Sequence, residues 1–128
     1  FIETTMGGES AAALLQKANI AYQNNDFEAA IQHYEVYVGQ KPDAIAVEMY
    51  LGICYLSTHQ FEVATITFEN LKEHSNQKDQ ATWLLALTYL KNDDLANCQS
   101  TLKELRENAA IKATPKRKGQ AKALLKAL

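Results

Sequence analysis

Three histidines and two cysteines are the side chains in this sequence best suited to nucleophilic or metal chemistry. None of them has a second histidine or cysteine at metal-ligand spacing, so we expect no metal site. The chain also has no G-x-S-x-G, H-E-x-x-H or P-loop motif that would hold a nucleophile, a zinc ion or a phosphate. We therefore predict a non-catalytic protein without a cofactor. The residues concerned are His33, His59, His74, Cys54 and Cys98.

The remaining candidates for chemistry have ordinary structural explanations. Asp93-Asp94 falls on a predicted turn, and Glu104 and Glu107 fall on a predicted helix surface, where solvation explains paired carboxylates. Both cysteines lie on apolar helix faces and far apart in the sequence. Two buried free thiols are favoured over a disulfide.

The segment from Leu51 to Leu71 has the pattern of one helical hairpin. Both halves of the segment carry apolar residues at helical spacing. The polar break between them, at 57–60, is short enough for a tight turn between antiparallel helices. The spaced apolar and small residues are Leu51, Gly52 and Tyr55 before the break and Phe61, Ala64, Phe68 and Leu71 after it.

The same residue types recur 34 positions later and earlier. Leu51 corresponds to Leu85 and Tyr55 to Tyr89. The separation of Tyr22 from Tyr55 is one less than this period, which predicts that the first turn is shorter by one residue. A fixed period of about 34 residues indicates an array of helical repeats. Each hairpin alone leaves an apolar face uncovered, so neighbouring hairpins must stack to form a core.

At these positions the chain resembles the tetratricopeptide repeat (TPR) family, whose pattern is W-x2-L-G-x2-Y, A-x3-F and a closing P. The matching residues are Ala18-Asn19, Tyr22, Ala30, Tyr34 and Pro42, then Leu51-Gly52, Tyr55, Ala64 and Phe68, then Leu85-Ala86, Tyr89, Cys98 and Leu102. The position of the family's tryptophan holds Leu15, Glu48 and Thr82 instead. The resemblance covers about residues 12–112 and implies an all-α, TPR-like α-solenoid of antiparallel helical hairpins, about seven helices in all.

The domain organisation follows from this repeat. We expect a flexible lead-in followed by a single TPR-like domain that closes with a capping helix. Pro115 suits the first position of that last helix, whose apolar residues lie on one face as a terminal solenoid helix requires. The expected ranges are 1–10 for the lead-in, 11–128 for the domain, about 12–44, 45–78 and 79–112 for the repeats, and about 115–127 for the capping helix.

Polar residues before the apolar runs predict where the helices begin. Expected N-caps are Ser10 or Glu9, Asp26, Asp43, Asp93 or Asp94, and Thr114. Gly39 and Pro42 are expected to end the second helix.

Composition and charge bound the class of protein. The 128 residues are 47% hydrophobic and 22% charged, as in a soluble globular domain, and no apolar run is long enough to span a membrane. The sequence leaves two compartments open, the cytoplasm, or the periplasm if an anchor precedes Phe1. The missing initiator methionine favours a fragment or a processed form. Residues 111–128 hold six Lys and Arg and no acid. We interpret this as a solvated capping face, the alternative being a binder of nucleic acid or of an anionic surface.

Two helices carry a second apolar face besides the core stripe. Such a helix is expected to be covered on both sides, and the TPR resemblance implies that these faces line a concave groove. We predict that the groove binds an apolar peptide or helix of a protein partner, with Tyr50 and Trp83 as anchors. The groove residues are Met49, Tyr50, Ile53, Leu56, Trp83, Leu84, Leu87 and Leu90.

Other occupants of this groove stay open. The chain's own last helix, its N-terminal Phe1-Ile2 or a second copy could cover it. A second copy would make the chain a homo-oligomeric scaffold segment, for example of a bacterial envelope protein. The Lys, Asn and Arg clamp by which some TPR domains hold acidic C-termini is absent, because its positions hold Gln16, Ile20, Tyr50, Gln80 and Leu84.

Overall fold

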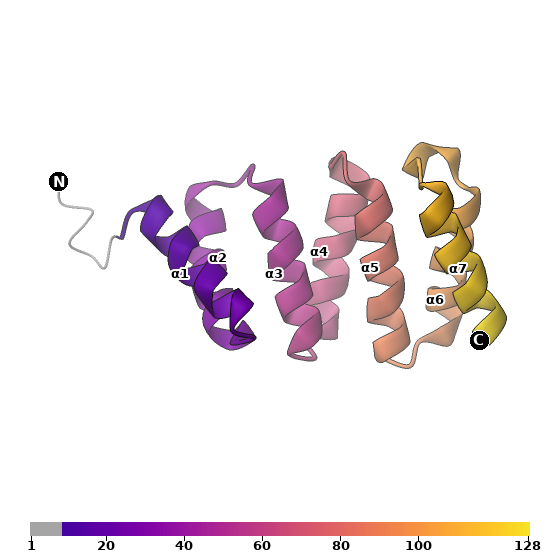
Figure 1. Cartoon of the computed structure of the whole chain (residues 1–128), viewed down its shortest axis with the longest axis horizontal. Helices are drawn as coiled ribbons and strands as arrows, with labels where there is room; N and C mark the ends of the chain where they lie inside the picture. The colour runs from indigo at the N-terminus through magenta and orange to yellow at the C-terminus, as the bar shows by residue number, and fades with distance from the viewer. Residues whose placement is uncertain (1–8) are drawn as a thin grey trace. The chain divides into compact units, whose positions relative to one another are not determined.

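The computed structural model describes residues 9–128, and this part of the chain is helical throughout (Figure 1). The prediction of an all-α, TPR-like helical solenoid is confirmed. Eight of the ten residues of the predicted lead-in lie outside the described residues. The helices are α1 (Ala11–Gln23), α2 (Phe27–Gln40), α3 (Ile45–Ser57), α4 (Phe61–His74), α5 (Lys78–Lys91), α6 (Leu95–Glu107), the 3-10 helix η2 (Ala109–Ile111) and α7 (Pro115–Ala127).

The chain divides into two compact units, Phe1–Thr58 and His59–Leu128. In the first unit, α2 packs against both α1 and α3. In the second unit, α5 packs against α4 and α6, and α7 covers α6. The boundary falls in the turn between α3 and α4.

Four predicted N-caps are confirmed. Ser10, Asp26, Asp94 and Thr114 each accept a hydrogen bond from the backbone amide three residues later, at 3.1–3.3 Å. Each such bond satisfies one of the amides that a helix start leaves unpaired. Pro115 occupies the first turn of α7, where its missing N–H costs nothing.

Two predictions at the junction of α2 and α3 are wrong. Gly39 does not end α2, which continues to Gln40, and a Cβ at Gly39 would meet no atom within 4 Å. The helix ends where Pro42 forces the preceding Lys41 out of helical geometry, at φ −132° and ψ 74°. Asp43 does not cap α3 either, since the N-cap is Ala44 and no side chain bonds to the start of that helix.

The turns within the three hairpins share one backbone conformation. Asn25, His59 and Asp93 adopt left-handed φ values of 61°, 63° and 59°. They are separated by one full repeat period each, and α2, α4 and α6 begin two residues after them. The three turns are therefore equal in length, and the predicted shorter first turn is wrong.

This register changes which residues of the first repeat are equivalent to those of the others. Ala21, not Tyr22, corresponds to Tyr89 of the third repeat. The carbonyl of Ala21 accepts from the amide of Asp26 at 2.8 Å. The carbonyl of Tyr89 accepts in the same way from the amide of Asp94, at 2.9 Å. Tyr22 thus takes the place of an apolar side chain in the other repeats.

The left-handed turn residue gives a first testable prediction. His59→Val should lower the free energy of unfolding by about 1–3 kcal/mol, because a β-branched side chain is strained at positive φ. His59→Gly should be neutral or stabilising, because glycine adopts this conformation without strain. Urea unfolding of the two variants measures the difference, and equal stability would contradict the assignment of the turn.

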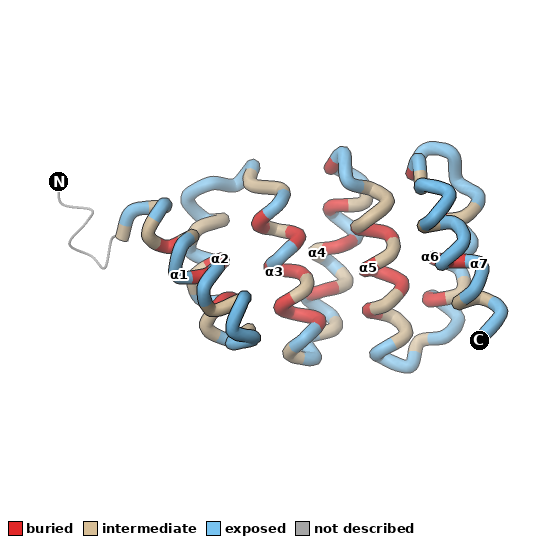
Figure 2. The backbone as a smooth tube through the Cα atoms, in the orientation of Figure 1, coloured by how far each residue is buried: buried red, intermediate tan, exposed pale blue. Residues whose placement is uncertain are grey.

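The core follows the repeat. Tyr34, Phe68 and Leu102 occupy equivalent positions, and each is at most 1% exposed. Figure 2 shows buried positions, in red, recurring along the helices. In the second unit, Leu102 belongs to a cluster on which the half-buried Leu124 and Leu125 of α7 pack. The apolar stripe of the predicted capping helix therefore faces the core.

A repeated polar contact joins successive hairpins within each unit. The hydroxyl of Tyr55 donates to the Glu35 carboxylate at 2.5 Å. One repeat further along the chain, Tyr89 donates to Glu69 at 3.4 Å. The first repeat lacks this contact, since Ala21 stands where the tyrosine would be. Because the glutamates are polar, they do not belong to the apolar spacing that indicates the repeat. The Tyr–Glu pairs are therefore not apparent from the sequence.

Candidate functional site

The four predicted groove residues of α3 differ in exposure. Met49 and Leu56 are buried, Ile53 is half-buried and Tyr50 is 43% exposed. Tyr50 is therefore the side chain of this set most accessible to a partner. Because α3 turns apolar residues to all sides, it lacks the single polar face of an ordinary surface helix.

The four predicted groove residues of α5 are more enclosed. Leu84 is buried, while Trp83, Leu87 and Leu90 are half-buried. Trp83 and Leu90 pack on the cluster that α7 also contacts. The chain's own last helix, one of the occupants left open above, therefore packs on the same cluster as Trp83 and Leu90 of α5.

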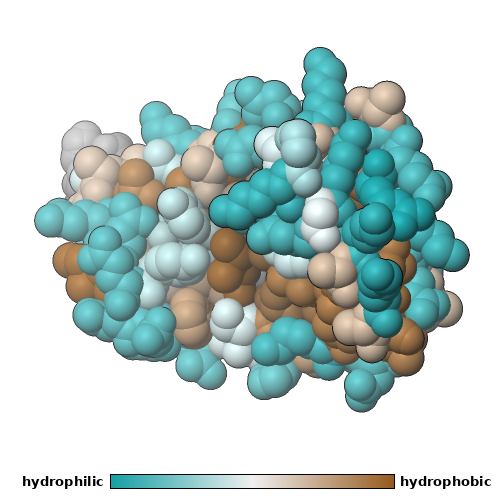
Figure 3. Space-filling view, turned by 45° about the vertical axis from the view of Figure 1, so that its right-hand side comes forward, coloured by the Kyte–Doolittle hydropathy of each residue, from teal (hydrophilic) through white to brown (hydrophobic). Residues whose placement is uncertain are grey.

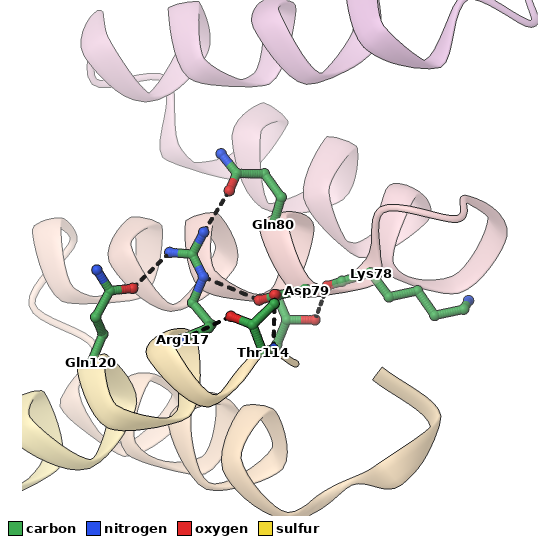
Figure 4. A network of polar contacts seen from close by, with 7 residues as sticks. Lys78, Asp79, Gln80, Thr114, Arg117 and Gln120 are labelled. Carbon is green, nitrogen blue, oxygen red and sulfur yellow. Dashed lines mark hydrogen bonds and ion pairs between the residues drawn. The ribbon is translucent and has the colours of Figure 1, made fainter. Parts of the chain in front are cut away.

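Arg117 attaches the start of α7 to α5. Its guanidinium donates to the Asp79 carboxylate at 3.1 Å and to the side-chain oxygens of Gln80 and Gln120 at 2.7 and 3.2 Å (Figure 4). It also lies 5.0 Å from the ring centroid of Trp83, within the range of a cation–π contact. Part of the positive charge of this helix is thus neutralised.

The other cations of α7 point to solvent. Lys118, Lys122 and Lys126 are exposed and four residues apart, so they form one row along the helix. Figure 3 shows hydrophilic side chains beside apolar ones that also reach the surface. The row is compatible with both interpretations of the basic segment, a solvated cap and an anion-binding face, and its role stays a prediction.

A cavity of about 500 Å³ lies between the turn before α5 and η2. Among its polar groups, the Lys78 ammonium donates to the carbonyls of Lys72 and Glu73 at the end of α4, at 2.8 and 2.9 Å. The Asp79 carboxylate forms an ion pair with Arg117. Lys78 and Asp79 thus already have partners within the chain.

A second cavity, in the first unit, is walled by three tyrosine rings and two amides. We call it the tyrosine pocket; it has a volume of about 270 Å³ and is lined by Asn19, Tyr22, Gln23, Tyr34 and Tyr50. Tyr34, 1% exposed, forms its buried part, and Tyr50 stands at its rim. The Tyr34 hydroxyl donates to the side-chain oxygen of Asn19 at 2.7 Å.

The rings of the tyrosine pocket contact one another. Tyr22 meets Tyr50 edge-on with centroids 5.1 Å apart, and Tyr34 lies nearly parallel to Tyr50 at 6.4 Å. Burial raises the pKa of Tyr34 to about 12 and also raises the pKa of Tyr22, so both phenols are neutral at physiological pH. Of this pocket, only Tyr50 was predicted from the sequence to contact a partner. Asn19, Tyr22 and Tyr34 were named there as residues that match the repeat, and the alignment of Tyr22 with Tyr55 hid its position beside Tyr50.

The two cysteines are shielded from solvent. Cys54 and Cys98 are free and fully buried, as predicted, and burial raises the pKa of Cys54 to about 12 and also raises that of Cys98. Residues 9–128 contain no group of three or more His, Cys, Asp or Glu that could hold a metal ion. In the same range, no helix is long and apolar enough to cross a membrane.

Comparison with known proteins identifies the fold. No protein-family model matches the chain, and no curated protein matches it. Two solved structures of SycD, a type III secretion translocator chaperone of Yersinia enterocolitica, are similar. One, described as an alternative dimer, has a TM-score of 0.75 at 20% identity and covers 92% of this chain and 90% of its own. The other has a TM-score of 0.73 at 19% identity and covers 99% and 97%. At these identities the likeness shows a TPR-like helical repeat fold.

Proposed function

We propose that this chain is a non-catalytic protein-interaction module that binds an apolar peptide or helix of a partner through apolar side chains of α3 in the first unit and, taken separately, of α5 in the second unit. The observation that carries the proposal is Tyr50, a large aromatic side chain 43% exposed on a helix whose other faces are apolar. Aromatic residues of this kind are enriched among the anchors of protein interfaces. Ile53 and Leu87, both half-buried, extend the apolar surface on their own helices.

Two further observations support this function. The two thiols are buried and their pKa values are raised, which argues against a cysteine nucleophile. The structurally similar SycD is a chaperone, a protein that acts on other proteins. We carry over from it only the class of activity, protein binding.

The proposal is tested with immobilised apolar helical peptides and the full chain carrying Tyr50→Ala together with Trp83→Ala. Each lost contact removes roughly 1.5–3 kcal/mol of apolar burial, so we expect binding at least tenfold weaker with unchanged helix content. The matched control is Val36→Ala together with Ile66→Ala, which removes apolar side chains that are 51% and 62% exposed on α2 and α4.

Two outcomes would contradict this proposal. Binding retained by the Tyr50 and Trp83 variant would show that these helices do not hold the partner. An equal loss in the control variant would show that binding reflects general adhesion to apolar surface rather than a site.

A second candidate function is self-association, with the same side chains covered by another copy. It is favoured by the similar solved structure that is described as a dimer. Light scattering coupled to size exclusion, over a wide range of concentrations, distinguishes the two functions. A dimer that dissociates on Tyr50→Ala supports self-association, and a monomer at every concentration rules it out.

A further inference from the structure

The tyrosine pocket lies between the first repeat and Tyr50 of the second, and three of its first-repeat residues differ from their counterparts in the other repeats. Its Asn19 and Tyr34 form a polar pair, whereas the equivalent positions of the second and third repeats hold apolar side chains. Tyr22 likewise stands where the other repeats have leucine. The equivalent residues are Ile53, Phe68 and Leu56 in the second repeat and Leu87, Leu102 and Leu90 in the third. At three positions the first repeat thus has polar groups where the other repeats have apolar side chains. Such a departure from the repeat pattern is typical of a functional site.

The pocket offers two kinds of attraction to a ligand. It is lined by three phenol rings, and the electron-rich face of an aromatic ring attracts cations. Its polar lining groups add the amide oxygen of Gln23 and the hydroxyls of Tyr22 and Tyr50. Gln23 and Tyr50 are exposed and Tyr22 is half-buried, so these side chains reach the surface. An aliphatic side chain placed there would leave these oxygens unpaired, at a cost in free energy.

Charge and size narrow the choice of ligand. Residues 9–58 contain six acidic and two basic residues, so the unit that holds the pocket attracts cations and repels carboxylates. The volume of about 270 Å³ is just below the range of pockets for drug-sized ligands and suits one long side chain. A guanidinium has planar donors for several acceptors and a face that stacks on aromatic rings.

We propose that the tyrosine pocket binds an arginine side chain of a basic peptide segment. The guanidinium stacks on the ring of Tyr50 and donates to the side-chain oxygens of Asn19 and Gln23. The proposal adds a chemical requirement to the protein-binding function and rests on that function only in taking the ligand to be a peptide.

The second unit contains an internal example of the same recognition. There Arg117 lies over the ring of Trp83 and donates to the amide oxygens of Gln80 and Gln120. An aromatic ring and two amide oxygens thus hold a guanidinium in this protein, and the tyrosine pocket offers the same set of groups without an occupant from residues 9–128. One difference is that Arg117 also has the carboxylate of Asp79, so binding in the tyrosine pocket should be weaker.

The test is an NMR titration of the full chain with blocked single amino acids, following the side-chain amides of Asn19 and Gln23. The probes are N-acetyl-arginine methylamide, its uncharged analogue with citrulline, and the lysine and leucine equivalents. We expect the arginine probe to bind at least fivefold more tightly than citrulline or leucine. It should also bind more tightly than lysine, whose compact ammonium is more strongly hydrated.

Two variants at the exposed rim of the pocket provide the control. Tyr50→Phe keeps the ring and should retain arginine binding within about twofold, whereas Tyr50→Leu removes the π face and should weaken it at least fivefold. Equal binding of the citrulline or leucine probe, equal binding of lysine, or no shift of either amide up to the solubility of the probe would each overturn the proposal. Binding of apolar peptides, measured separately, would be untouched by that result.

Discussion

Leu102→Ala should lower the free energy of unfolding by about 2–5 kcal/mol, since this side chain is fully buried in the cluster beneath α7. The loss combines the transfer free energy of the deleted carbons with the cost of the cavity they leave. Cys98 and Leu105 of this cluster lie on the same helix as Leu102, and the other buried members, Ala86, Ile111 and Ala121, lie on α5, η2 and α7. These close-packed surroundings relax only in part, so a cavity remains.

Urea unfolding followed by circular dichroism measures this effect. The matched control is Leu95→Ala on the same helix, which deletes the same atoms from a side chain that is 48% exposed and should cost well under half as much. Similar losses for the two variants would show that α6 does not pack with the face assigned to it.

Stability should fall steeply above pH 9. The buried Cys54 thiol ionises near 9.0 when exposed but has a pKa of about 12 in the fold, because burial penalises the thiolate. Between these values the unfolded chain binds fewer protons than the folded chain, so the free energy of unfolding decreases as pH rises. Below pH 9 both states keep the proton and the contribution is constant.

Two tyrosines add to this slope at pH values above the ordinary tyrosine pKa. Burial raises the pKa of Tyr34 from 10.0 to about 12, and burial together with the Glu35 hydrogen bond raises the pKa of Tyr55. Each group that ionises only in the unfolded state adds about 1.4 kcal/mol per pH unit. We therefore expect a slope that begins near pH 9 and steepens above pH 10.

Urea unfolding at a series of pH values from 7 to 11 tests this expectation. Cys54→Ala should flatten the slope most between pH 9 and 10, where an unfolded thiol ionises ahead of the tyrosines, while Cys98 still contributes there because its pKa is also raised. A uniform loss of stability from the substitution does not affect the slope. An unchanged slope would mean that the thiol is not shielded from solvent in the fold.

The sequence by itself determined the helices, the repeat and most helix starts. Ser10, Asp26, Asp94 and Thr114 cap helices as predicted because a cap bonds an amide only three residues away. The repeat period is visible because the same residue types recur 34 positions along the chain. Caps and period are read directly from the order of residues, so they can be inferred without knowing how the helices pack.

Only the tertiary structure decided which residues meet across helices. Matching residues by type aligned Tyr22 with Tyr55. The backbone conformation of the hairpin turns instead aligns Ala21 with Tyr55, and the ring of Tyr22 contacts Tyr50. The tyrosine pocket, the Tyr55–Glu35 bond and the position of Arg117 over Trp83 join residues that are far apart in the sequence. Met49 and Tyr50 are neighbours on α3, yet Met49 is buried and Tyr50 is exposed. The spacing of apolar residues in the sequence did not predict this difference. These contacts arise from the packing of whole helices, which a one-residue change of register alters while the composition and the period stay the same.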